Sequence, residues 1–263
     1  MSHLIDQTFQ KKIESNKQKR LMPLLEEILR EYVSKACRTM SQENLNKFLD
    51  LCYKNAQAQG TEKFGEIKAF TFLAYNLGVE FYKDPLYPKI VTIFESDSPI
   101  DIKLNRAVNY YLKNHYLYTK EHIHWYLVAL NKLEKVAFPA IPNPLSSELM
   151  AKYLYSTYPQ RVKKLGGVKK LQELMPHYHR TLEAQQLNTP LGHFVFYMVW
   201  MFKGSSLLID PQFAWFQKEF YVYEESPNLK SRRFLRVILK RLRKEKRDVN
   251  GVLELLRGVE DEF

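Results

Sequence analysis

Two His-x-His pairs come nearest to metal chemistry in this sequence: His122/His124 and His177/His179. Imidazole is a common zinc ligand. Both pairs fall within predicted helices, where residues two apart point to different faces, so neither pair can chelate a metal by itself. His193 could join the second pair only through tertiary proximity. We therefore expect no metal site and no cofactor, and histidines that are solvated or hydrogen-bonded.

Other signatures of catalysis are missing from the sequence. It contains no glycine-rich phosphate loop, no G-x-S-x-G elbow and no H-E-x-x-H motif. The paired carboxylates Glu26/Glu27 and Glu224/Glu225 are adjacent in sequence, so their side chains diverge. We expect a protein that is not an enzyme, with catalysis by its histidines kept as the alternative from a different class.

An Asp-Pro pair occurs twice, each time followed by aromatic residues. Aspartate is a good helix N-cap, and proline is tolerated at the first helical position because its missing N–H costs nothing there. We therefore predict two equivalent structural corners in place of catalytic aspartates. Their residues are Asp84, Pro85 and Tyr87 in the first, and Asp210, Pro211, Phe213 and Trp215 in the second.

The positive charge is concentrated in one segment. Between Lys230 and Arg247 there are ten basic residues and one acid, Glu245, which supplies +9 of the net charge of +11. The rest of the chain is therefore close to neutral, unlike a protein that binds nucleic acid over its whole surface.

This segment predicts a basic amphipathic helix near 227–247. Leu235, Ile238, Leu239 and Leu242 form its apolar stripe. A solvated basic face, a docking surface for an acidic protein, and a site for nucleic acid or anionic lipid are all open. Exposed aromatic residues that would favour single-stranded nucleic acid are missing apart from Phe234. The candidate partner-binding residues are Arg232, Arg236, Lys240, Arg243 and Arg247.

Composition places these residues in a helical protein. The 263 residues include only nine glycines, and apolar and polar residues alternate in helical waves. The two cysteines, Cys37 and Cys52, form no disulfide framework and favour a reducing compartment. With no signal core and no apolar run near 20 residues, we expect a soluble, cytoplasmic protein that does not span a membrane.

Start signals divide the chain into helices. Ser41 precedes a helix over 42–58, Thr61-Glu62 opens one that runs through Phe81, Asp84-Pro85 opens the next, and Ser98-Pro99 opens one that ends near Tyr118. Thr119 is predicted to cap a separate helix over 120–136. The stretch 137–147 contains three prolines and no helical period, so we interpret it as a linker.

The pattern before this linker returns after it. Seven pairs of residues or short motifs recur in order, at offsets between 124 and 128 positions. This recurrence predicts an internal duplication. The pairs are Tyr32/Tyr158, Tyr53/Tyr178, Phe70-Thr71-Phe72/Phe194-Val195-Phe196, Asp84-Pro85/Asp210-Pro211, Tyr87/Phe213, Ser98-Pro99/Ser226-Pro227 and Leu112-Lys113/Leu239-Lys240.

The predicted fold is therefore all-α, with two tandem, internally duplicated helical bundles packed into one compact body. The N-terminal bundle covers residues 1–137, and the C-terminal bundle covers 138–263 with the basic helix. The aromatic segments near 68–82 and 193–202 are apolar nearly all round, which is typical of central helices. We expect the halves to pack near these helices and to offer a groove to a partner.

Part of the first half resembles a known family. An aromatic-ended helix, a Cys, an Ala-rich turn, Leu-Gly and Phe-x-x-Asp-Pro-x-Tyr-Pro follow one another over residues 20–95, and more faintly over 147–220. This order resembles accessory proteins encoded beside VgrG-type spike genes of bacterial type VI secretion systems. The chain departs from the family at Tyr82, where many members have an acid, and at Lys89, where they have Trp. The matching residues are Tyr32, Cys37, Ala56, Ala58, Leu77-Gly78 and the run from Phe81 to Pro88.

The resemblance implies effector delivery between bacteria. We expect a non-enzymatic adaptor or chaperone of a type VI secretion gene cluster, whose partner is an effector or spike protein with an acidic or apolar docking surface. An immunity protein that occludes a toxin is the alternative. A protein partner is favoured over nucleic acid.

Overall fold

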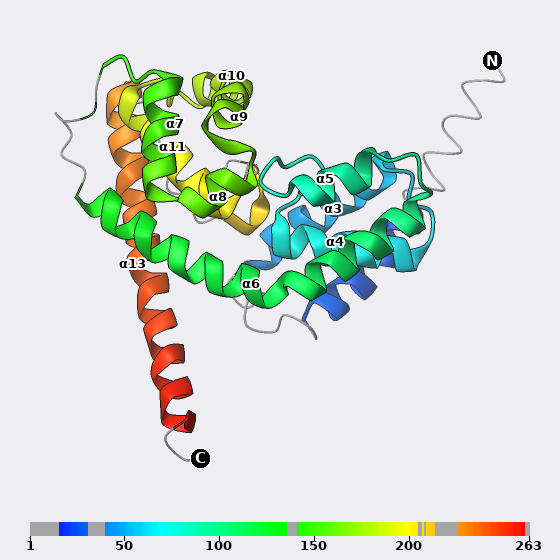
Figure 1. Cartoon of the computed structure of the whole chain (residues 1–263). Helices are drawn as coiled ribbons and strands as arrows, with labels where there is room; N and C mark the ends of the chain where they lie inside the picture. The colour runs from blue at the N-terminus through cyan, green and yellow to red at the C-terminus, as the bar shows by residue number, and fades with distance from the viewer. Residues whose placement is uncertain are drawn as a thin grey trace, which may run out of the picture. The chain divides into compact units, whose positions relative to one another are not determined.

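The computed structural model describes residues 16–30, 40–135, 141, 143–204, 207, 209–213 and 226–260. Within helices, the side chains of residues 115–126, 203, 245 and 247–260 lie outside this description. The described residues form helices and turns without a strand (Figure 1), which confirms the all-α prediction. Tyr32, Cys37 and Trp215 lie outside the described residues.

The chain divides into two compact units. Unit 1 consists of Met1–Lys113 and Ser205–Ala214, and unit 2 consists of Asn114–Gly204 and Trp215–Phe263. The division does not follow the boundary at 137/138 drawn from the sequence, because a segment after α11 belongs to unit 1 and the second part of α6 belongs to unit 2.

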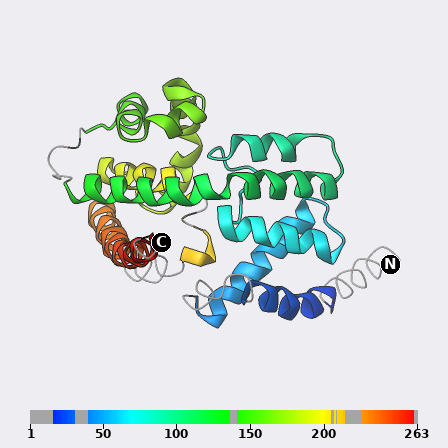
Figure 2. The same ribbon diagram turned by 60° about the horizontal axis from the view of Figure 1, so that its bottom comes forward.

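Unit 1 is built around an aromatic helix. It contains a helix over 16–30, α3 (Gln42–Ala58), α4 (Phe64–Leu77), α5 (Pro88–Glu95), the first part of α6 (Ile100–Glu134) and the short turn η3 (Pro211–Phe213). α3 packs on α4 (Figure 2). The Phe70 ring lies 4.9 Å from the Phe81 ring, and Phe81 lies 5.4 Å from Phe94, between ring centroids. These buried rings confirm that the first aromatic segment is core.

Unit 2 packs its short helices around α11 (Pro190–Lys203). The other elements are the end of α6, α7 (Ser147–Thr157), α8 (Pro159–Lys164), α9 (Gly167–Leu174), α10 (Pro176–Ala184) and α13 (Pro227–Glu260). α11 is buried nearly all round, and its Tyr197 hydroxyl donates to the Met175 carbonyl at 2.9 Å. The Tyr158 hydroxyl donates to the Met198 carbonyl at 3.2 Å. The hydroxyls of these two buried tyrosines thus find acceptors within the core.

α11 and α13 approach very closely at one point. A Cβ on Gly192 would lie 2.3 Å from the Leu187 carbonyl oxygen and 2.8 Å from the Ser231 Oγ. Only a residue without a side chain fits there. Thr189 caps α11 by accepting from the Gly192 N–H at 3.0 Å, and its hydroxyl lies 2.6 Å from the Ser231 hydroxyl.

Element boundaries recur between the halves at one offset. α11 begins and ends 126 positions after α4, and each is followed by a glycine at positive φ, Gly78 (101°) and Gly204 (88°). α3 ends at Ala58 and α10 at Ala184, again 126 positions apart. At this offset Phe70 corresponds to Phe196, two positions from the partner assigned by sequence. Common descent of the two halves stays a prediction.

The sequence placed the start of α3 correctly. α3 begins after Ser41, whose hydroxyl accepts from the Asn44 N–H at 3.3 Å. Ser146, within the predicted linker, caps α7 in the same way without having been predicted, accepting from the Leu149 N–H at 3.1 Å. The pair Gly166-Gly167 marks the boundary between α8 and α9.

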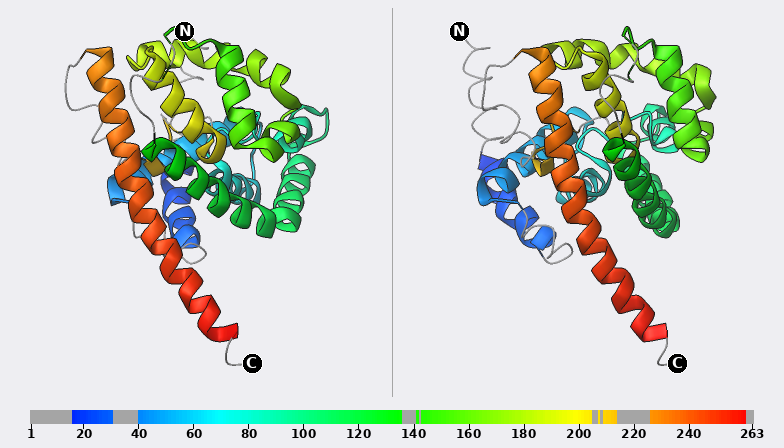
Figure 3. Two further views of the ribbon diagram at one scale, coloured as in Figure 1. Left: turned by 60° about the vertical axis from the view of Figure 1, so that its left-hand side comes forward. Right: turned by 90° about the vertical axis from the view of Figure 1, so that its left-hand side faces the viewer.

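Two predicted helix boundaries are wrong. α4 begins at Phe64 and ends at Leu77, because Glu66 accepts from the backbone N–H groups of Glu62 and Lys63 and Gly78 ends the helix. Thr119 caps no separate helix: α6 continues from Ile100 to Glu134 (Figures 1 and 3). This stretch contains neither proline nor glycine to interrupt it.

Candidate functional site

The basic face predicted for α13 is exposed. Arg232, Arg236, Lys240 and Arg243 are exposed along the helix, whereas the side chain of Arg247 lies outside the described residues. The buried side of α13 differs in part from the predicted apolar stripe. Ile238 and Leu242 are buried as expected, but Leu235 and Leu239 are only half-buried. Phe234 and Val237 complete the buried side in their place.

Arg243 and Lys230 of this segment contact other elements of unit 2. Arg243 Nε lies 2.8 Å from Glu134 Oε1 at the end of α6. Lys230 is buried and its Nζ donates to Gln186 Oε1 at 3.1 Å. The Arg243–Glu134 ion pair is exposed, and such a pair contributes about 0–1 kcal/mol to stability. Arg232, Arg236 and Lys240, at i, i+4 and i+8, form an exposed row along one side of the helix.

The structure brings together two of the histidines. The rings of His179 in α10 and His193 in α11 stack with centroids 5.4 Å apart and planes 13° from parallel, and Tyr197 meets His193 edge-on. Burial, and secondarily the neighbouring His179, lowers the pKa of His193. Stacked rings direct their nitrogens sideways and not towards one shared ion. The side chains of His122 and His124 lie outside the described residues.

In the described part of the chain, no three His, Cys, Asp or Glu side chains are grouped closely enough to hold a metal ion. Cys52 is buried and unpaired with another cysteine, and burial raises the pKa of its thiol well above the usual value. Such a thiol is a poor nucleophile at neutral pH.

The two Asp-Pro corners have the same local geometry. Asp84 Oδ1 accepts from the Leu86 N–H, and Asp210 Oδ1 accepts from the Gln212 N–H, both at 2.9 Å. In each corner the Asp carbonyl accepts from the N–H three residues on, Tyr87 or Phe213, again at 2.9 Å.

This geometry corrects the helix-cap interpretation of Asp84-Pro85. α5 begins three residues later, at Pro88, and Pro211 is the first residue of η3. The carboxylate closes a tight Asp turn, which satisfies nearby backbone N–H groups just as a cap would. Both aspartates are buried, consistent with the predicted structural role.

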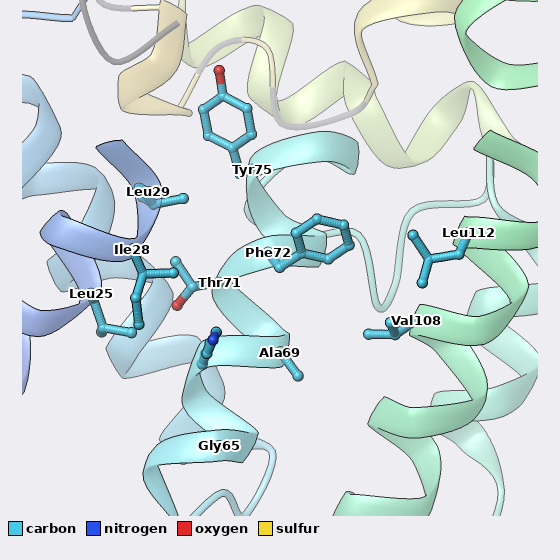
Figure 4. A pocket seen from close by; sticks show the side chains of 11 residues that line it. Leu25, Ile28, Leu29, Gly65, Ala69, Thr71, Phe72, Tyr75, Val108 and Leu112 are labelled. Carbon is cyan, nitrogen blue, oxygen red and sulfur yellow. The ribbon is translucent and has the colours of Figure 1, made fainter. Parts of the chain in front are cut away.

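An apolar groove in unit 1 was not anticipated from the sequence. It is a cavity of about 410 Å³ bordered by the helix over 16–30, α4 and α6 (Figure 4). Among the described residues that line it, Lys68 is the only charged one, and the Thr71 hydroxyl already donates to the Ile67 carbonyl at 2.8 Å. At its α6 wall Leu112 is 56% exposed. The lining residues include Leu25, Ile28, Leu29, Phe72, Tyr75, Val108 and Leu112.

The groove escaped sequence reasoning because its walls come from three separate helices. The apolar pattern of α4 predicted a central helix, but not which other helices would border it. The burial of Arg161 could not be predicted either. It lies in a run of basic residues, which is typical of a solvated surface, yet it is only 5% exposed. In the described structure its Nε and Nη2 have no hydrogen-bond partner.

Within the described residues, no helix combines the length and apolar character needed to cross a bilayer. Comparison of the chain with protein-family models, with curated proteins and with solved structures finds no match.

Proposed function

We propose that this protein is a non-enzymatic binding protein, an adaptor or chaperone of a type VI secretion gene cluster, that docks an acidic surface of an effector or spike protein on the basic face of α13. The observation that carries the proposal is the exposure of Arg232, Arg236 and Lys240 in one row. The assignment to secretion draws on the resemblance over residues 20–95.

Charge complementarity supports this assignment of the docking face. A row of like charges attracts a partner of opposite sign, which speeds association and fixes its orientation. The attraction falls as salt rises, because the Debye length is only about 8 Å at physiological ionic strength.

The test is capture of spike and effector proteins from the native host by the full chain. One variant reverses Arg232, Arg236 and Lys240 to Glu, and leaves Arg243 with its partner Glu134. A control reverses three exposed lysines of α8 and α9, Lys163, Lys164 and Lys169, and so changes the net charge equally. Circular dichroism checks that both variants fold.

We expect wild type and the control to retain the partner, and the basic-face variant to lose it. Retention by both variants would overturn the docking site. Enrichment of nucleic acid without a protein partner would overturn the proposed class. A partner bound through its catalytic domain, with loss of toxicity, would identify an immunity protein in place of an adaptor.

A further inference from the structure

The end of α6 covers a surface of unit 2. Ala129, Leu130 and Leu133 are buried there. Lys132 Nζ lies 5.9 Å above the centre of the Tyr153 ring of α7. Two residues further, Glu134 pairs with Arg243 of α13. The last two turns of α6 therefore lie against α7 and α13.

The corresponding surface of unit 1 is the apolar groove. At the offset of 126, Tyr153 corresponds to Glu27, beside the groove residue Ile28. Phe194, whose ring lies 5.0 Å from Tyr153, corresponds to Lys68 on the groove wall. The counterparts of the groove residues in unit 2 are buried, with the exception of Tyr155. They are Ala151, Leu154, Leu191, Phe194, Val195, Tyr197, Met198, Met201, Phe234 and Ile238.

Two differences keep the surface of unit 1 open. Its walls carry smaller side chains at some positions, with Val108 and Thr71 where unit 2 has Phe234 and Tyr197. In addition, no described helix lies over Leu112 as the end of α6 lies over unit 2, and Leu112 remains 56% exposed.

A segment with a similar spacing of apolar residues lies 126 positions after the covering segment. Residues 127–134 read LVALNKLE, and residues 253–260, at the same offset, read LELLRGVE. The buried Ala129, Leu130 and Leu133 correspond to Leu255, Leu256 and Val259. The larger Leu255 in place of Ala129 suits a groove whose walls are smaller.

This segment lies at the end of α13. This helix is continuous to Glu260, and at 1.5 Å per residue Leu253 lies about 16 Å beyond the buried Leu242. Figure 3 shows this end of α13 running past the other helices of unit 2. Residues 253–262 also contain three Glu and one Asp against one Arg, a charge that complements Lys68 on the groove wall.

We propose that the apolar groove of unit 1 receives residues 253–260 of α13 from a second copy of this chain. α6 starts in unit 1 and ends on unit 2; by the same arrangement α13 starts in unit 2 and ends on the unit 1 of the next copy. The contact is head-to-tail, so it builds a closed ring or an open row of copies. It is independent of the proposed function, because the basic face takes no part in it.

The test is sedimentation of the full chain over a range of concentrations. Leu112→Asp places a charge in the groove at an exposed position, and Leu256→Asp places one in the covering segment. Leu229→Asp is the control, because Leu229 is an apolar residue of similar exposure (53%) elsewhere on α13. A chain ending at Asn250 is the second variant of the covering segment.

We expect wild type and Leu229→Asp to associate, and the other three variants to associate at least about tenfold more weakly, because one buried leucine contact is lost. The decisive sample mixes Leu112→Asp with Leu256→Asp. The first keeps an intact covering segment and the second an intact groove, so together they form a dimer that neither forms alone.

Three results would overturn the proposal. Wild type could stay monomeric at every concentration, as when its own α13 or residues 1–15 occupy the groove. Association could also survive Leu112→Asp, or the mixed variants could fail to pair although each is folded by circular dichroism. The variant with Arg232, Arg236 and Lys240 changed to Glu should associate like wild type, which keeps this test separate from that of partner docking.

Discussion

Asp210 Oδ2 accepts a hydrogen bond from the backbone N–H of Val79 at 3.2 Å, which joins residues 131 positions apart within unit 1. Both residues are fully buried. Gln212, two positions after the aspartate, donates from its side chain towards the Ala74 carbonyl at 3.4 Å. The segment around Asp210 is therefore held at the end of α4 by one buried and one partly buried hydrogen bond.

Replacing Asp210 with Ala should destabilise the protein by about 2 kcal/mol, because the N–H groups of Val79 and Gln212 lose their acceptor. Urea unfolding measures the change. Asp97→Ala, at an exposed position, is the control and should change stability by less than about 0.5 kcal/mol. Equal effects of the two substitutions would refute the role given to Asp210.

Asp210 should also make stability depend on pH. Burial raises the pKa of its carboxyl from 3.8 to about 6, against the opposing effect of its hydrogen bonds. Its proton stabilises the folded state fully below pH 4, and this contribution is lost as the pH rises to 6, by at most about 3 kcal/mol. The difference in urea midpoint between wild type and Asp210→Asn isolates this titration. Parallel pH profiles for the two proteins would contradict the prediction.

His193 should act in the opposite sense. Its pKa is lowered by burial and, less strongly, by His179, so its contribution to stability is present above pH 6.5 and is lost as the pH falls through the folded-state pKa. In an NMR titration, His179→Gln should raise the pKa of His193 but leave it below 6.5. His177→Gln, at an exposed position, should leave it unchanged. A pKa unaffected by His179→Gln would show that the stacked rings do not interact electrostatically.

Replacement by alanine should change the stability of the protein in opposite directions at two glycines. Gly192→Ala drives a Cβ into the Leu187 carbonyl and should cost about 2–3 kcal/mol. Gly65→Ala meets nothing within 4 Å in α4 and should stabilise the helix by about 0.5–1 kcal/mol. Thermal unfolding of the two variants beside wild type measures both effects. A tolerated Gly192→Ala would mean that α11 and α13 can separate at this point.

Local signals predicted the local features of this fold. Ser41 marks a helix start because a serine hydroxyl satisfies a free N–H where the chain turns into a helix. The exposed row on α13 followed from helical periodicity alone. The same reasoning failed at Asp84, because a helix cap and an Asp turn both use a carboxylate that accepts from a nearby N–H, and both tolerate a following proline.

Long-range features could not be predicted in this way. The assignment of Ser205–Ala214 to unit 1 involves contacts such as that of Asp210 with Val79, which no periodic pattern marks. The groove needs three helices to meet, and the stacking of His179 on His193 needs α10 to fold against α11. α6 continues past Thr119 in spite of the cap signal there. Burial of Ala129, Leu130 and Leu133 stabilises the last turns of the helix.

The membership of Ser205–Ala214 in unit 1 has a consequence for synthesis on the ribosome. A domain made of one continuous stretch can fold as soon as that stretch emerges. Unit 1 cannot, because Val79 has no Asp210 to bond until more than 130 further residues have been translated. Most of unit 2 has left the ribosome by then. In the nascent chain, unit 1 therefore stays incomplete while unit 2 begins to fold.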